Sequence, residues 1–330
     1  MRIFVAGASG AIGRRLLPRL LEKGHEVVGQ ARSERSAGIV RSLGAEPATA
    51  DALDGEAVRR AVVRARPEAV VHQLTAFAGM SDLRHFEREA ETTNRLRTEG
   101  TDHLIAAARE SGARRFVAQS FAPTVYAREG GPVKTEEDRL DPDPPKPFRT
   151  TVEAVEHLER AVRGAPDIEG LVLRYGGFYG PGTSLGEPDE AGRGGEYLAA
   201  IRRRRFPLVG SGGGVWSFVH VDDAASATVA ALERGAPGIY NIVDDDPAPA
   251  SEWLPALASA LGARPPRRVP AWAARLLAGE AAVDLMTEIR GSSNAKAKRE
   301  LGWSPRWPSW RDGFVHGLDS PPHAGAAGEV

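Results

Sequence analysis

The chain has 330 residues, and its 43 basic residues are balanced by 44 acidic ones, with no cysteine. This length suits one large domain or two modest ones, and the near-neutral charge gives no reason to expect nucleic acid as a partner. Without cysteine there are no disulfides, thiolate metal sites or cysteine nucleophiles. No apolar run approaches the ~20 residues of a membrane helix, and the first strand leaves no room for a signal peptide. We therefore expect a cytoplasmic protein without a membrane partner.

The first segment predicts a strand, a glycine-rich turn and a helix. Residues 1–6 are mostly apolar, the turn reads Gly7-Ala-Ser-Gly-Ala-Ile-Gly13, and apolar residues with helical spacing follow. Such a turn presents unpaired helix N–H groups to an anion such as a pyrophosphate. We interpret Gly7 as the tight turn, Gly10 as the point where phosphate approaches, and Gly13 as the close contact of helix with strand. The segment thus predicts dinucleotide binding.

Further strands and helices alternate after this unit. Strands are predicted at 26–31, from Ala48, at 67–74 and at 115–120, with helices at 55–65 and around 84–111. This alternation predicts right-handed βαβ units, and therefore an α/β protein with a doubly wound parallel sheet, the Rossmann fold.

The later part of the chain predicts a smaller, mostly helical substrate lobe, with helices at 253–261, 271–277 and 294–301. The assigned ranges are 1–175 and 213–247 for the cofactor domain, 176–212 and 248–318 for the substrate lobe, and 319–330 for a disordered tail. Within the lobe, we expect the stretch 186–195 to form a mobile loop over the substrate.

Several motifs together resemble the extended short-chain dehydrogenase/reductase family, also called the NAD-dependent epimerase/dehydratase family. They are GASGAIG from Gly7, AVVHQLTA from Ala69, EGTDHLIAAARESGARRFVAQS from Glu99, LVLRYGGFYGPGT from Leu171, SFVHVDDAASA from Ser217 and NAKAKRELGWSP from Asn294. The resemblance covers about residues 1–315. It implies the Rossmann fold, a nicotinamide cofactor, and a homodimer formed through two helices of the cofactor domain.

The resemblance also implies which residues contact the cofactor. It places Gly7, Ser9, Gly10, Ala11, Ile12 and Gly13 at the pyrophosphate, Asp51 and Ala52 at the adenine, Leu74 and Thr75 at the middle of the cofactor, and Tyr175 and Gly177 beside the nicotinamide. The second strand ends at Arg32, with no carboxylate before Glu34. A charge-assisted bond from Arg32 to a 2′-phosphate, worth about 1.5–3 kcal/mol, favours NADP(H) over NAD(H). The alternative is that Arg32 is a solvated surface residue.

The chain departs from the family where the chemistry is expected. Family members carry Tyr-x-x-x-Lys after the fifth strand, where the Tyr passes a proton and the Lys lowers its pKa. The conventional order puts Phe148 at the Tyr position and Val152 at the Lys position, and neither transfers a proton. A positioned acid or base is typically worth 10²–10⁴-fold in rate. Ser120 and Tyr126 are the candidate catalytic replacements; the alternative for Ser120 is capping of the next turn, and for Tyr126 packing is favoured.

On the substrate side, nucleotide-sugar members place an Arg where this chain has Trp216 and an Asn where it has Gly177. Replacing a phosphate-binding Arg by Trp argues against a nucleotide sugar and for an uncharged, partly apolar or aromatic small molecule. The alternative is that Trp216 packs the domain interface. The substrate-binding candidates are Gln119, Phe148, Tyr179 and Trp216, and Tyr179 also suits a structural turn.

Three other groups have simpler interpretations. His72 lies inside a buried strand and is interpreted as a core histidine. His220, Asp222 and Asp223 look like metal ligands in isolation, but the family starts a structural helix there, and we predict no metal. The run Arg202–Arg205 ends a helix, where cations favour the dipole and face solvent.

These observations predict an atypical NAD(P)-dependent oxidoreductase or epimerase-like enzyme acting on a small carbonyl or hydroxyl compound. Its proton would come from substrate, water, Ser120 or a tyrosine. Two alternatives stay open. The first is an NADP(H)-binding regulator or scaffold without turnover, which would explain Phe148 and Val152 directly. The second is an isomerase or lyase that uses the cofactor transiently.

Overall fold

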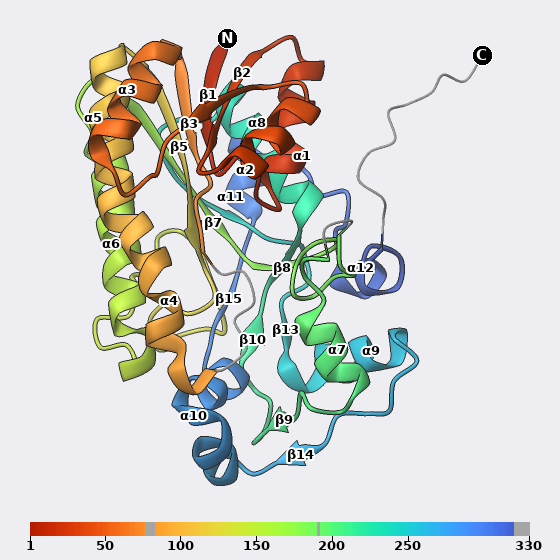
Figure 1. Cartoon of the computed structure of the whole chain (residues 1–330). Coiled ribbons are helices and arrows are strands. Elements are labelled where there is room, and N and C mark those ends of the chain that lie inside the picture. Colours follow the sequence, from red (N-terminus) through yellow and green to blue (C-terminus); the bar gives the residue numbers. More distant parts are fainter. Residues whose placement is uncertain (77–82, 190–191, 320–330) are drawn as a thin grey trace.

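The computed structural model describes residues 1–76, 83–189 and 192–319. Its centre is a parallel sheet of seven strands in the order β12-β7-β5-β4-β1-β2-β3 (Figure 1). These strands are β1 (Arg2–Ala6), β2 (Glu26–Ala31), β3 (Glu46–Thr49), β4 (Ala69–His72), β5 (Arg115–Phe121), β7 (Glu169–Tyr175) and β12 (Gly238–Ile242). The predicted doubly wound α/β fold is confirmed, and β2 has the predicted bounds.

Helices cover both faces of this sheet because its buried strands are apolar on both sides. In β1, Ile3 and Val5 join one core cluster, whereas Phe4 joins another on the opposite face. The first face is covered by α1 (Gly13–Glu22), α2 (Glu34–Ser42), α8 (Val221–Arg234) and α11 (Ala295–Leu301). The second is covered by α3 (Gly55–Ala65), α5 (Thr101–Ser111) and α6 (Arg149–Arg163) (Figure 1).

The helix predicted around 84–111 is divided. A short 3-10 turn, η1 (Leu83–His85), precedes α4 (Phe86–Arg95), and a π-helical segment, η2 (Leu96–Gly100), joins α4 to α5. The end at Gly112 is as predicted, because its φ of +78° suits glycine.

A separate hydrophobic cluster forms around the fully buried Trp253 and Trp310. Most of the elements that carry it lie below the sheet in Figure 1. Its elements are α7 (Glu196–Arg202), β9 (Leu208–Val209), β10 (Val215–Trp216), β13 (Ala248–Pro249), α9 (Ala250–Ala260), β14 (Arg268–Val269), α10 (Ala271–Thr287) and α12 (Trp310–His316). The remaining short elements are β6 (Val133–Lys134), η3 (Lys146–Phe148), β8 (Gly177–Tyr179), β11 (Phe218–His220) and β15 (Gly291–Ser292).

The helix, the loop and the tail predicted for this part of the chain can now be compared with the structure. The helix predicted at 271–277 continues to Thr287 across a kink at Gly279, where φ is +84°. The loop expected at 186–195 and the tail expected at 319–330 fall partly outside the described residues. Within the described part of the chain, none of the helices combines the length and apolar character that a membrane crossing requires.

The glycine turn after β1 shows why two of its glycines are not equivalent. A Cβ on Gly13 would lie 2.3 Å from the carbonyl oxygen of Gly7 and 2.4 Å from that of Ala8. A Cβ on Gly10 would meet only the Gly7 oxygen, at 3.2 Å. Gly13 therefore lets the helix pack on the turn, whereas Gly10 has a single and less severe contact.

We expect Gly13→Ala to destabilise the fold by about 1–3 kcal/mol, since backbone atoms must move to admit the methyl group. Gly10→Ala is the matched control and should melt close to wild type. Thermal denaturation of the two variants checks this. Equal melting temperatures would contradict the packing role of Gly13.

Candidate functional site

The predicted cofactor contacts follow the ends of four neighbouring strands. The glycine turn follows β1, Arg32 follows β2, Asp51 and Ala52 follow β3, and Leu74 and Thr75 follow β4. Because these strands are parallel neighbours, all of these residues lie at one edge of the sheet. The chain after β4 passes so close to the turn that a Cβ on Gly7 would lie 2.5 Å from the Gln73 carbonyl oxygen. At this edge the strand order reverses, which is where doubly wound folds bind their ligands.

The turn itself fits an anion. The open side of Gly10 adjoins the start of α1, whose N-terminal N–H groups favour negative charge. Two guanidinium groups lie at the same turn: Arg14 Nε donates to the Ser9 carbonyl oxygen at 3.0 Å, and Arg193 Nη1 donates to it at 3.3 Å. Both also face the Asp189 carboxylate, which lies 2.9 Å from Arg193 Nε and 3.7 Å from Arg14 Nη1. Burial and the neighbouring charge of Arg193 lower the pKa of Arg14. The sequence analysis missed Arg193, which is 184 positions from Ser9.

The end of β2 presents an arginine without a competing carboxylate. Arg32 is exposed, and its side chain makes no ion pair or hydrogen bond with the described residues. The nearest acid on this turn, Glu34, is paired with Arg41 at 2.6 Å. The guanidinium of Arg32 is therefore available to an anionic ligand.

Two of the predicted cofactor residues are held by contacts within the protein. Asp51 accepts the N–H of Leu53 at 3.0 Å. Tyr175 is fully buried; its hydroxyl lies 2.7 Å from Thr228 Oγ1 and accepts from Gln73 Nε2 at 3.2 Å. Burial raises the pKa of Tyr175 to about 12. The phenol of Tyr175 is thus a core group.

The positions expected to carry the family's acid and its lysine are apolar and enclosed. Phe148 is 1% exposed and packs edge-to-face on Phe86, with ring centroids 4.8 Å apart. Val152 is 2% exposed and lies in a cluster with Val125 and Tyr126. No titratable side chain occupies either position.

The two candidate replacements belong to one buried hydrogen-bond network. Ser120 Oγ donates to Glu159 at 2.8 Å, and Glu159 forms a buried ion pair with Arg174 at 2.5 Å. Arg174 Nη1 donates to the Tyr126 hydroxyl at 2.9 Å, and that hydroxyl donates to Asn241 Oδ1 at 2.6 Å. Burial raises the pKa of Tyr126 to about 12. Both hydroxyls are therefore engaged within the protein.

The substrate candidates of the lobe are mostly enclosed. Trp216 is 9% exposed, stacks on Phe218 and donates its indole N–H to the Leu285 carbonyl at 2.8 Å, contacts that a packing role would also make. Tyr179 is fully buried against Phe218. Gln119 at the end of β5 is also buried, and its amide oxygen has no hydrogen-bond partner among the described residues.

A small cavity lies beside Phe148. Its lining residues are Pro123, Thr124, Tyr126, Arg128, Asp141, Phe148, Glu288 and Ile289. Thr124 is 9% exposed, and its hydroxyl has no hydrogen-bond partner among the described residues. The sequence analysis missed Thr124, because a threonine after a strand is not unusual by itself.

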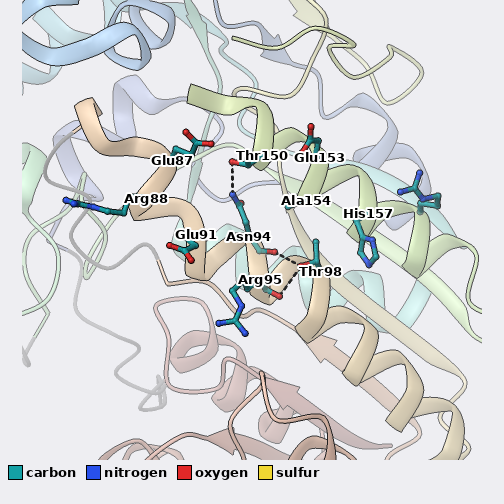
Figure 2. Close-up of a pocket in the computed structure, with 11 residues that line it drawn as sticks. Glu87, Arg88, Glu91, Asn94, Arg95, Thr98, Thr150, Glu153, Ala154 and His157 are labelled. Carbon is teal, nitrogen blue, oxygen red and sulfur yellow. Dashed lines mark hydrogen bonds between the residues drawn. The ribbon is translucent and has the colours of Figure 1, made fainter. Parts of the chain in front are cut away.

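A wider groove of about 680 Å³ runs between α4 and α6. Figure 2 shows charged side chains along it, including Glu87 and Arg88 on α4 and Glu153 on α6. Asn94 bridges the two helices by donating to Thr150 Oγ1 at 3.4 Å and to Thr151 Oγ1 at 3.2 Å. The groove is lined by residues of α4, η2 and α6, and none of its lining residues belongs to the glycine turn.

His72 is a satisfied core histidine, as predicted. Its Nδ1 accepts the N–H of Leu74 at 3.2 Å, its Nε2 lies 3.1 Å from Thr101 Oγ1, and burial lowers its pKa to about 4.

His220, Asp222 and Asp223, which look like metal ligands in the sequence, make hydrogen bonds that stabilise the fold. His220 Nδ1 accepts the backbone N–H of Asp222 and so caps the start of α8, where the sequence predicts a structural helix. The Asp223 carboxylate accepts two backbone N–H groups, at 2.8 and 3.0 Å.

Comparisons with known proteins bear on the fold and the family of the chain. The chain is 48% identical over 316 residues to a 3-diazoavenalumate denitrifying reductase from a Streptomyces species, covering 95% of this chain and 99% of the relative. It is 29% identical over 352 residues to the 4-hydroxy-2-methyl-3-oxo-4-farnesyl-3,4-dihydroquinoline-1-oxide ketoreductase of Stigmatella aurantiaca, covering 100% and 98%. The crystal structure of UDP-glucose 4-epimerase with UDP-glucose from Thermotoga maritima matches with a TM-score of 0.74 at 22% identity, covering 96% and 97%.

The model of the NAD-dependent epimerase/dehydratase family matches residues 3–243. Reductases and epimerases are thus the named relatives, and the chain is an oxidoreductase or epimerase-like enzyme. This chain belongs to the NAD-dependent epimerase/dehydratase family, also known as the extended short-chain dehydrogenases/reductases.

Proposed function

We propose that this enzyme reduces a small aromatic diazo compound with NADP(H), and that no protein acid takes part. The observation that carries the proposal is the enclosed phenyl ring of Phe148 at the position expected for the family's proton donor. With Val152 also buried, one helical turn further along the chain, the site would offer hydride transfer without a paired proton transfer. A reaction that consumes hydride alone fits such a site.

Reduction of an arenediazonium cation is a reaction of this kind. A C–H bond forms at the ring carbon, the C–N bond breaks, and its electron pair leaves with dinitrogen. Cation and hydride give an arene and dinitrogen, so the step balances without a proton. A ketone, in contrast, must gain a proton as its oxygen becomes an alcohol.

The name of the Streptomyces relative describes reductive removal of nitrogen from a diazo compound, and its 48% identity over 95% of this chain supports a related substrate class. We further propose that nucleotide sugars are excluded, because Trp216 and Gly177 stand where such members carry Arg and Asn. A small carbonyl or hydroxyl compound is the second candidate, since the unpaired hydroxyl of Thr124 lies beside Phe148 and can donate to a substrate oxygen.

The roles of the chain's residues follow from this proposal. When bound, the reduced nicotinamide supplies the hydride. The glycine turn from Gly7 to Gly13 holds the pyrophosphate, and Arg32 holds the 2′-phosphate. Phe148 and Val152 exclude water from the reacting carbon, while Ser120 and Tyr126 act through their network with Glu159 and Arg174 to hold the helix α6 in place.

We expect the purified enzyme to oxidise one NADPH for each dinitrogen released from an arenediazonium salt, with deuterium from [4-²H]NADPH appearing on the ring. Because no acid titrates in the step, kcat should vary less than about twofold across roughly pH 5.5–7.5. A simple aryl ketone is the control and should react about 10²–10⁴-fold more slowly. Gas analysis, mass spectrometry and nicotinamide absorbance are the readouts.

Three results would contradict the proposal in different ways. Cofactor binding without oxidation of any substrate supports a regulator. Substrate conversion with no net NADPH oxidation supports an isomerase or lyase. Faster reduction of the ketone means that an acid is present after all.

We also propose that NADP(H) is preferred to NAD(H). Arg32→Ala should weaken NADP(H) binding about ten- to 150-fold and leave NAD(H) nearly unchanged, because only NADP(H) carries the 2′-phosphate. Arg41→Ala, whose guanidinium pairs with Glu34, is the matched control and should not discriminate. Equal weakening of both cofactors in Arg32→Ala, measured by calorimetry, would exclude the phosphate contact.

The assembly and domain roles are proposals as well. We propose a homodimer that forms through α4 and α6, the helices that border the groove in Figure 2; light scattering of the purified chain measures its mass directly. Residues 176–212 and 248–318 are proposed to bind the substrate, and a cytoplasmic location remains a prediction of the sequence.

A further inference from the structure

We propose that the cavity beneath Thr124 is the subsite for an oxygen substituent on the ring of an aromatic substrate. This inference rests on the proposed function, because it places the substrate beside Phe148. The cavity is enclosed by the segment after β5, by Phe148 and by the residues that follow α10, Glu288 and Ile289. Three separate parts of the chain therefore build it.

The hydroxyl of Thr124 is the group that needs a ligand. It is nine-tenths buried and has no hydrogen-bond partner among the described residues. A buried hydroxyl without a partner is costly, and native proteins pair nearly all such groups. An oxygen atom of a bound substrate would accept its proton in a hydrogen bond.

The neighbouring hydroxyls of Ser120 and Tyr126 already donate hydrogen bonds within the protein and are not free to bind a substrate oxygen in this way. Ser120 donates to Glu159 at 2.8 Å, and the Tyr126 hydroxyl donates to Asn241 at 2.6 Å. Around the carboxyl end of β5, Thr124 is thus the hydroxyl that stays unengaged in the described structure.

The remaining walls indicate the kind of oxygen. The cavity has about 10 Å³ of free space, room for about one oxygen atom and not for a ring, and it is also lined by Arg128 and by the carboxylates of Asp141 and Glu288. A ligand carboxylate placed in this cavity would be repelled by these two acids. A neutral phenol or carbonyl oxygen satisfies Thr124 and adds no negative charge. Thr124 then positions the substrate and does not transfer a proton.

The test compares two ligands that differ by one hydroxyl. Calorimetry measures the affinity of 4-hydroxycinnamate and of cinnamate for wild type, Thr124→Val and Thr124→Ser, with and without NADP⁺. Wild type should prefer 4-hydroxycinnamate by about three- to tenfold, the usual range for one neutral hydrogen bond. Thr124→Val should abolish that preference and leave the affinity for cinnamate unchanged. Thr124→Ser, which keeps the hydroxyl, should retain the preference.

Stability provides the independent readout. Because Thr124→Val removes an unpaired hydroxyl, the ligand-free variant should melt at or above the wild-type temperature; a lower temperature would show that the hydroxyl already has a structural partner and would overturn the proposal. If Thr124→Val fails to fold, Thr124→Ala is measured in its place. A wild type that binds neither ligand or shows no preference, or a valine or alanine variant that keeps the preference, overturns it too.

This test is separate from that of the proposed function. Binding of the two cinnamates needs no hydride transfer, so an enzyme that leaves diazonium salts unreduced can still show the Thr124-dependent preference. Conversely, reduction of diazonium salts without that preference would retain the proposed function and reject the subsite.

Discussion

The buried ion pair between Glu159 and Arg174 is the interaction on which the candidate site depends. It joins α6 to β7, and each partner also bonds one of the hydroxyls that the sequence analysis considered for catalysis. Removing one partner of such a pair typically costs about 3–5 kcal/mol, because the other charge is left buried. The pair therefore fixes α6 against the sheet. It also keeps Ser120 and Tyr126 within the core, while the same helix packs Val152 against Val125.

Much of the fold follows from local sequence. Strands buried on both faces of a parallel sheet are mostly apolar, so β1 and β4 stand out as short apolar runs. The glycine turn is equally visible, because only glycine at position 13 avoids a backbone clash. The π-helical segment between α4 and α5 was missed, since its residues continue the helical spacing on both sides and differ only in how their backbone hydrogen bonds are made.

The site was less predictable because its contacts join distant parts of the chain. Ser120 hydrogen-bonds Glu159, 39 positions further along the chain, and Tyr126 hydrogen-bonds Asn241, 115 positions further along. No local sequence pattern therefore identifies the partner of either hydroxyl. Two signals were nevertheless present. Glu159 is a charge on the apolar face of α6, and Arg174 is a charge inside the apolar run of β7. Charges at such positions are seldom buried unless they are paired.

The charges around Phe148 bear on which electrophile such a site would accept. The cavity beside it carries one guanidinium, from Arg128, and two carboxylates, from Asp141 and Glu288, so its formal charge is negative. Hydride transfer to a ketone develops a further negative charge on the ketone oxygen, close to these carboxylates. Enzymes that catalyse such a step normally supply hydrogen-bond donors that stabilise this oxygen. Hydride transfer to a cation has the opposite requirement. The carboxylates favour the cation on entry, and its charge disappears as dinitrogen leaves. A site in which Phe148 and Val152 stand at the predicted acid and lysine positions would be a poor catalyst for the first reaction and would suit the second, in line with the substrate class proposed above.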